Sequence, residues 1–123
     1  MRNTLITLAV TCAAFLAQPG AVMAHHGAAT FDTTNEVTVK GTVTDWTWAN
    51  PHCILRVDVA AADGTVTNWS VATSNIADVA KRGWSRRSFK AGDTVTLTIQ
   101  PAKSGAPVGM IRNVVLPDGT KLQ

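Results

Sequence analysis

Three histidines are the residues of this sequence whose types and positions are best suited to binding chemistry. His25 and His26 become the first two residues if the chain is cleaved after Ala24, and His52 follows a later turn. A terminal amine beside imidazole rings offers a compact set of nitrogen ligands. Such ligands favour copper, which leads the divalent affinity order and accepts square-planar nitrogen coordination. We therefore expect copper as a cofactor, bound by His25, His26 and His52.

Nitrogens of the terminal amine and of the histidine rings, with His52 completing the set, would form a T-shaped group of three ligands. This group resembles the histidine brace of exported copper proteins. The alternative is that the terminal histidines bind nothing and that His52 only hydrogen-bonds its loop. Cys53 is not expected as a ligand, because neighbours in a strand point to opposite faces and Cys53 has the parity of core residues. Met110 offers a thioether for Cu(I), but a methionine in an apolar strand is expected to pack.

Residues 1–24 have the pattern of a secretory signal peptide. Arg2 gives a positive start, residues 4–17 carry no charge, and Val22 and Ala24 occupy the −3 and −1 positions of a signal-peptidase site. We predict cleavage between Ala24 and His25 and a location in the periplasm or the medium. The alternative of a membrane anchor is disfavoured because an apolar run of about 14 residues is shorter than the roughly 20 that cross a bilayer. No transmembrane segment is expected after cleavage.

The composition is that of one globular domain. The chain has 123 residues, of which 46% are hydrophobic and 15% charged, which excludes a disordered chain and a large multidomain enzyme. Cys53 becomes the sole cysteine after cleavage, so no internal disulfide is possible. Nucleophile motifs, paired carboxylates and phosphate loops are not found, so we expect a binding protein and not an enzyme.

Alternation of apolar and polar residues predicts five strands. They cover residues 37–48, 53–59, 65–72, 94–99 and 108–116. The parity of the first strand changes near Thr44 and Asp45, which predicts a bulge or sharp coil there. One helix follows the third strand, with Ser74 as the expected cap. Gly83 should end it, with Trp84 folding back onto Val79 in a Schellman-type cap.

Three strands, one helix and two strands make the connectivity of an OB-fold, a five-stranded Greek-key barrel. The predicted fold class is all-β with one helix. A small β-sandwich with a helical crossover is the alternative. We divide the chain into a signal peptide (1–24), an extended arm (25–35) and the barrel domain (36–123).

A second candidate site is a tryptophan-rich rim on the barrel. Aromatic residues on strands two and three and their loops form the usual ligand face of an OB-fold. The candidate rim residues are Trp46, Trp48, Trp69 and Arg56. This pattern supports the alternative function of a metal-free periplasmic module that binds a protein, glycan or small-molecule partner. The alternative for at least two of the four tryptophans in the sequence is that they fill the barrel or its ends.

A basic stretch follows the predicted helix and suits an anionic partner such as a lipid headgroup or an acidic protein. Its members are Lys81, Arg82, Arg86, Arg87 and Lys90. The alternative is a solvated helix end. Stacking aromatics beside basic residues are typical of single-stranded nucleic-acid binding, but we expect no nucleic-acid partner for an exported protein. The sequence leaves the oligomeric state open.

The mature chain resembles a family of small exported bacterial proteins of unknown function. The resemblance rests on Ala24-His25-His26, on Asn50-Pro51-His52, on Arg82-Gly83-Trp84 and on the turn from Lys90 to Asp93. It covers essentially the whole mature chain. The family usually has His-His-Ser-Phe, whereas here Gly27 follows the pair and Phe31 comes later. The resemblance implies export and an OB-like fold, and it brings no catalytic residues with it.

Overall fold

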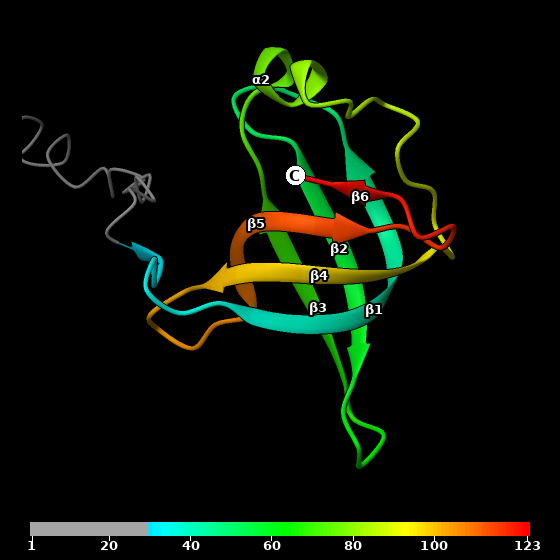
Figure 1. Cartoon of the computed structure of the whole chain (residues 1–123). Helices are drawn as coiled ribbons and strands as arrows, with labels where there is room; N and C mark the ends of the chain where they lie inside the picture. Colours follow the sequence, from blue (N-terminus) through cyan, green and yellow to red (C-terminus); the bar gives the residue numbers. More distant parts are fainter. Residues whose placement is uncertain (1–29) are drawn as a thin grey trace, which may run out of the picture.

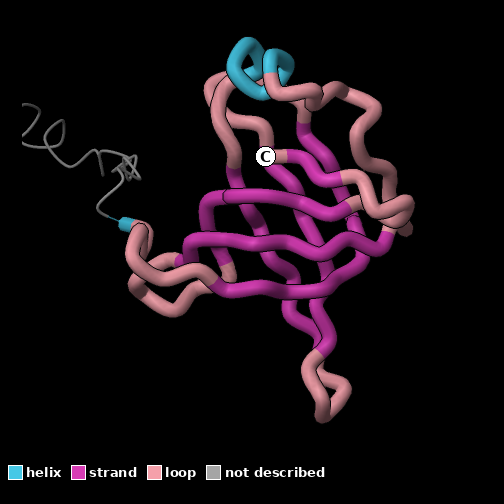
Figure 2. The backbone as a smooth tube through the Cα atoms, in the orientation of Figure 1, coloured by secondary structure: helices cyan, strands magenta, loops and turns pink. Residues whose placement is uncertain are grey.

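Alternating side chains produce the strands at the positions where the sequence predicts them (Figures 1 and 2). The computed structural model describes residues 30–123. The predicted signal peptide, its cleavage site, His25 and His26 lie outside the described residues. The elements in order are β1 (Val37–Thr47), β2 (Ile54–Ala60), β3 (Val66–Ala72), α2 (Ile76–Lys81), β4 (Thr94–Pro101), β5 (Val108–Val115) and β6 (Lys121–Leu122).

A parallel pairing closes the sheet into a barrel. The strand order β3-β2-β1-β4-β5-β6 is antiparallel throughout. Three residues of β3, beginning at Ser70, then pair in parallel with three of β5, beginning at Val108. Figure 1 shows α2 at one end of the barrel, with the β2–β3 loop projecting from the opposite end. The predicted OB-like barrel with one helix after the third strand is confirmed.

The chain end forms a further strand, β6, beyond the five that the sequence predicts. Leu116 N–H donates to the Thr120 carbonyl at 2.8 Å, which folds the tail back. Lys121 then pairs with Val115, and Leu122 is buried against the core. Two residues are too few to show a periodicity, so this strand has no sequence signal of its own.

The predicted bulge lies in β1. Val43 pairs with Val57, but the next pair along joins Asp45 to Arg56, so β1 carries one extra residue, Thr44. After the bulge, Trp46 pairs with Leu55 on the inner face. The extra residue bends the strand, which allows β1 to pair with β2 at one end and β4 at the other.

Inward-facing aliphatic side chains fill the barrel. Cys53 is buried, as its strand parity predicts, and is a free thiol. The side chains with no exposed surface are those of Cys53, Leu55, Val57, Val71, Val79, Leu97, Ile99 and Val114. They come from β2, β3, β4, β5, α2 and the residue before β2, so one core holds every layer of the fold together.

The helix begins one residue later than the sequence analysis expects. Asn75, not Ser74, is the N-cap, because its side-chain oxygen accepts from Asp78 N–H at 3.0 Å. The Ser74 carbonyl instead accepts from Cys53 N–H at 3.2 Å, which keeps Ser74 in the ladder beside β2. The predicted Schellman cap at the other end is confirmed, with Trp84 N–H donating to the Val79 carbonyl at 3.1 Å.

The described part of the N-terminal arm is attached to the end of β4. Phe31 forms an isolated bridge with Ala102, and Asp32 N–H donates to the Pro101 carbonyl at 2.9 Å. The Gln100 amide donates to the Thr33 carbonyl at 3.2 Å. Phe31 itself is buried. The point at which residues 1–29 join the barrel is therefore set by β4.

Gly41 lies where two strands approach too closely for a side chain. A Cβ atom at this position would lie 2.7 Å from the Asp58 carbonyl oxygen. We expect Gly41→Ala to lower the free energy of unfolding by about 1–3 kcal/mol, because β1 and β2 must move apart. Urea denaturation measures this, with Thr38→Val on the exposed face of β1 as the control. Equal stability of the two variants would contradict the prediction, because it would mean that β1 and β2 can move apart at this contact without loss of stability.

Candidate functional site

A groove on the outside of the barrel runs along the seam where β3 meets β5. Its volume is about 650 Å³. The residues that line it are Phe31, Thr33, His52, Ile54, Ser70, Ala72, Thr73, Ser74, Arg82, Gln100, Val108, Gly109, Met110, Ile111 and Arg112. Strand parity explains why two of them, Met110 and Arg112, point outward. Gly109 and Ile111 are buried, so Met110 and Arg112 between and after them face the groove.

His52 is the one predicted metal ligand within the described residues, and it lies at the groove. Its Nδ1 is 2.9 Å from the Thr73 carbonyl oxygen. A carbonyl oxygen only accepts hydrogen bonds, so Nδ1 carries a proton here, and in the neutral ring Nε2 keeps its lone pair. Metal-binding histidines have this arrangement, in which a hydrogen bond from one ring nitrogen orients the other. The same bond also agrees with the alternative that His52 serves its loop.

The remaining ligands of the expected copper site, His25 and His26, precede the described residues. Within residues 30–123, no group of three or more His, Cys, Asp or Glu side chains is placed to hold a metal. Phe31, however, lines the same groove as His52. His26 precedes Phe31 by five positions, a stretch of chain that extends over at most about 18 Å.

Two arginines bring positive charge to the groove. Arg82 Nη2 donates to Thr73 Oγ1 at 3.5 Å, so Arg82 and His52 contact the same residue. Arg112 Nε lies 3.4 Å from a Glu36 carboxylate oxygen. Both members of that pair are about half exposed, so the ion pair adds little stability. No carboxylate is found among the described residues that line the groove.

The structure separates the predicted rim residues. The rings of Trp46 and Trp48 lie 5.8 Å apart, and Trp46 also contacts Trp84 and Phe89 at 6.0 and 4.9 Å. These aromatic residues pack where the loop after α2 crosses the barrel. The Trp46 ring N–H donates to the Ser85 carbonyl at 3.1 Å. The expectation that at least two tryptophans fill the barrel or its ends is confirmed by Trp84, which is buried, and Trp46, which packs on the core.

Trp69 and Arg56 lie on opposite faces of the sheet. Trp69 pairs with Val57, whose side chain is buried, and it packs against the core from there. Arg56 pairs with Ser70 on the outer face. The usual ligand face of an OB-fold therefore carries no tryptophan from β3 here.

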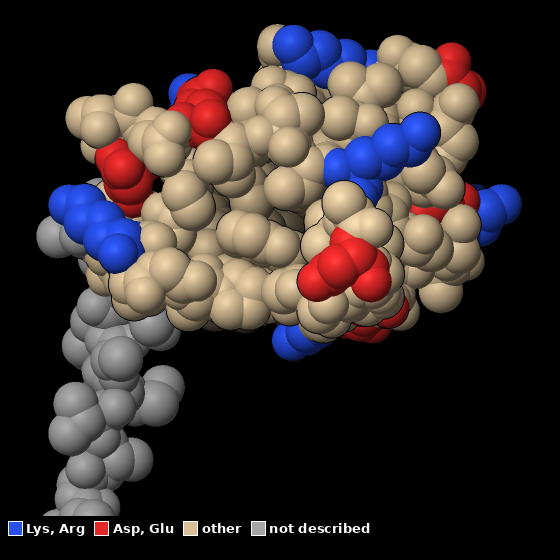
Figure 3. All heavy atoms as spheres, turned by 90° about the horizontal axis from the view of Figure 1, so that it is seen from below, with Lys and Arg blue, Asp and Glu red and all other residues tan. Residues whose placement is uncertain are grey.

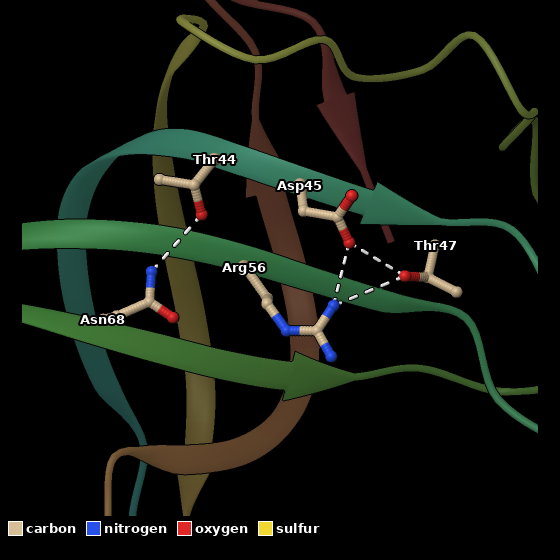
Figure 4. A network of polar contacts seen from close by, with 5 residues as sticks. All are labelled: Thr44, Asp45, Thr47, Arg56 and Asn68. Atoms are coloured by element: carbon tan, nitrogen blue, oxygen red, sulfur yellow. Dashed lines mark hydrogen bonds and ion pairs between the residues drawn. The ribbon is translucent and has the colours of Figure 1, made fainter.

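A network of polar side chains covers this outer face (Figure 4). Arg56 Nη1 lies 2.8 Å from Asp45 Oδ2 and also donates to Thr47 Oγ1 at 3.4 Å. Asn68 donates to Thr44 Oγ1 at 3.3 Å in the same view, and to Asp58 Oδ1 at 2.8 Å. The charge of Arg56 is thus paired within the sheet. Figure 3 shows a further face on which basic and acidic side chains alternate without a patch of one sign.

All members of the predicted basic stretch are exposed, as a solvated segment requires. They are Lys81, Arg82, Arg86, Arg87 and Lys90. Only Arg82 among them lines the groove. The stretch therefore divides into one residue at the groove and four elsewhere on the surface.

Three exposed carboxylates have lowered pKa values because they are hydrogen-bonded in turns. The pKa of Asp32 lies below its usual value, first because the Thr34 hydroxyl donates to it and then because the Thr34 main-chain N–H does. The pKa values of Asp63 and Asp118 are lowered mainly by the main-chain N–H two residues later. The turn at Asp32 lies between Phe31 and Thr33, which both line the groove.

Most of the groove was not predicted from the sequence. Met110 was expected to pack, whereas its side chain lines the groove together with His52. Arg112 and Ile54 also line the groove and were not among the predicted site residues. Strand parity around Gly109 and Ile111 would have placed Met110 and Arg112 outside. Only the pairing of β3 with β5 brings them close to His52 and Arg82.

The barrel is similar to a known structure that confirms the fold. This is the crystal structure of the mitochondrial single-stranded DNA binding protein Rim1 from S. cerevisiae, with a TM-score of 0.52 and 10% sequence identity. The match covers 68% of this chain and 93% of that chain. At this identity the likeness concerns the fold alone.

The sequence was also compared with curated proteins and with models of protein families. No curated protein matches this sequence. In the described part of the chain, no helix has the length and apolar character required to cross a membrane. The model of a family of unknown function, DUF6152, matches residues 12–112. That range includes His52, Arg82, Met110 and Arg112, and because it covers most of the sequence, this protein belongs to the DUF6152 family.

Proposed function

We propose that this protein is exported and binds copper through His25, His26 and His52, for handling or delivery and not for turnover. The observation that carries the proposal is the hydrogen bond from His52 Nδ1 to the Thr73 carbonyl, at 2.9 Å. It orients an exposed imidazole with Nε2 available to a metal.

The attachment of the arm supports joint coordination. Phe31 and His52 line one groove, and His25 and His26 precede Phe31 by six and five residues. The amine and ring of His25, the ring of His26 and His52 Nε2 would supply nitrogen ligands, which suit Cu(II). Two features support export, namely the signal-peptide pattern of residues 1–24 and the resemblance to exported proteins that begin Ala-His-His.

The tryptophan rim has weaker support. The ring N–H of Trp46 already donates to the main-chain oxygen of Ser85 at 3.1 Å. Arg56 is paired with Asp45. These groups contribute to the barrel's own packing, whereas His52 Nε2 has a ligand position to offer.

The copper proposal predicts a strict requirement for the amine of His25. We expect Cu(II) affinity to fall about 100-fold, or about 2.7 kcal/mol, when one alanine is added before His25 in the processed protein. His52→Ala is expected to lower affinity about tenfold, or about 1.4 kcal/mol. Competition titration against a Cu(II) chelator measures both changes. Lys40→Ala, an exposed change on β1, is the control.

The starting residue must be measured in the same material. Native mass spectrometry of the protein isolated from the envelope of its host gives the cleavage site and the bound metal together. Equal Cu(II) affinity with and without the added alanine would reject the proposal. A native chain that starts at any residue other than His25 would reject it as well.

A further inference from the structure

The groove between β3 and β5 has an aliphatic floor. Ile54, Ala72, Val108 and Met110 line it, and all four are only partly buried by the rest of the chain. They come from three neighbouring strands, since Ile54 pairs with Ala72 and Ala72 pairs with Met110. Phe31 closes the side but is itself buried, so its ring has little face left for stacking. The floor therefore offers contact with aliphatic groups and not with bases.

Positive charge is concentrated at the end of the groove near α2. The register of the parallel pairing places Ser70 and Val108 at one end, and Ala72 and Met110 further along. Beyond them come Thr73, which contacts Arg82, and Arg112, which follows Met110 by two residues on β5. A guanidinium has five N–H donors, so the contacts of Arg82 with Thr73 and of Arg112 with Glu36 leave donors for a ligand.

We propose that this groove binds an amphipathic monocarboxylate, with its carboxylate at Arg82 and Arg112 and its alkyl chain along the aliphatic floor. Arginine pairs favour carboxylates because the planar donors match the two oxygens. A sugar would need more hydrogen-bonding side chains than the floor provides, and a nucleotide would need an exposed aromatic face. The volume of about 650 Å³ is in the range of small-ligand sites.

This site does not depend on copper binding, and the two proposals predict opposite effects of the same change. Removal of positive charge from the groove weakens the binding of a carboxylate but strengthens the binding of a nearby cation. The variant Arg82→Gln/Arg112→Gln should bind decanoate about tenfold more weakly. It should bind Cu(II) about twofold more tightly, since repulsion across partly exposed surface is small.

The methyl group of Met110 provides a local probe. We would titrate the full protein, labelled with ¹³C at its methionine methyl groups, with sodium decanoate below its micelle concentration and in the presence of EDTA. Met110→Leu assigns the resonance. Decyl glucoside tests the need for the carboxylate, and Arg86→Gln/Lys121→Gln removes two exposed positive charges away from the groove.

The expected result is a saturable shift of the Met110 resonance with decanoate and none with decyl glucoside. The control variant should bind decanoate within about twofold of the original protein, and Ala72→Phe should reduce binding by filling the floor. The proposal is overturned if decanoate gives no shift, if decyl glucoside binds equally well, or if both double variants lose affinity equally. A groove occupied by residues before Thr30 would give no shift. One occupied by a second copy would give shifts that depend on protein concentration, and either result also overturns the proposal.

Discussion

Trp84→Ala is expected to lower the free energy of unfolding by about 3–5 kcal/mol, the range found when a buried aromatic side chain is removed. Trp84 is 3% exposed and contacts Trp46 and Phe89, with ring centroids 6.0 and 5.6 Å away. Its main-chain N–H also completes the cap of α2 by donating to Val79. Trp84 thus joins the helix through its main chain, and its side chain joins the loop after the helix to β1; only the side-chain contacts are lost in the alanine variant.

Loss of Trp84 should also affect the groove, because Arg82 lies two residues before it. Chemical denaturation gives the stability, and the Met110 titration gives decanoate affinity under conditions where the variant stays folded. Trp84→Phe is the matched control, since it keeps an aromatic ring and removes the bond to Gln123. Alanine and phenylalanine variants of equal stability would contradict the packing role assigned to this residue.

Leu97→Ala is expected to cost about 2–5 kcal/mol, the range for removal of a buried leucine side chain. Leu97 has no exposed surface and lies on β4, where it pairs with Val39 of β1 and Val114 of β5. The barrel is closed around this position, so the neighbouring strands cannot move in to fill the space. Urea denaturation measures the change.

Val66→Ala supplies the control for Leu97→Ala. Val66 is 57% exposed at the start of β3, so its truncation removes apolar surface without leaving a cavity. We expect a change within about 0.5 kcal/mol at such a site. A small effect at both positions would mean that β4 adjusts to the missing side chain and that the core is less tightly packed than the burial indicates.

Local patterns were sufficient to predict most of the fold. The alternation around Val95, Leu97 and Ile99 marks a strand, and the change of parity near Thr44 marks the bulge. Gly83 followed by Trp84 specifies the helix end, because the bonds of a Schellman cap join residues close in sequence. The cap at the helix start was misplaced by one residue, since Ser74 is held by Cys53, a partner distant in sequence.

Some features of the candidate sites could likewise be predicted from the local sequence, and others could not. His52 could be identified from residue type and position, and the core location of Cys53 followed from strand parity. The groove could not be identified, because Arg82, Met110 and Arg112 are brought together by the parallel pairing of β3 with β5. That pairing joins strands separated by a helix and another strand, and no local pattern specifies its register.

The sequence alone determined the order of strands, the position of the helix and the face that each strand turns to the core, because these depend on the spacing of apolar residues along a few positions. The tertiary structure alone decided which outward-facing residues become neighbours. Barrel closure brings Met110 and Arg112 of β5 to the groove that His52 and Arg82 line, and the bridge to Ala102 places Phe31 there. The physical reason is that closure is a property of all the strands together, fixed by the bulge in β1 and by the packing of one shared core.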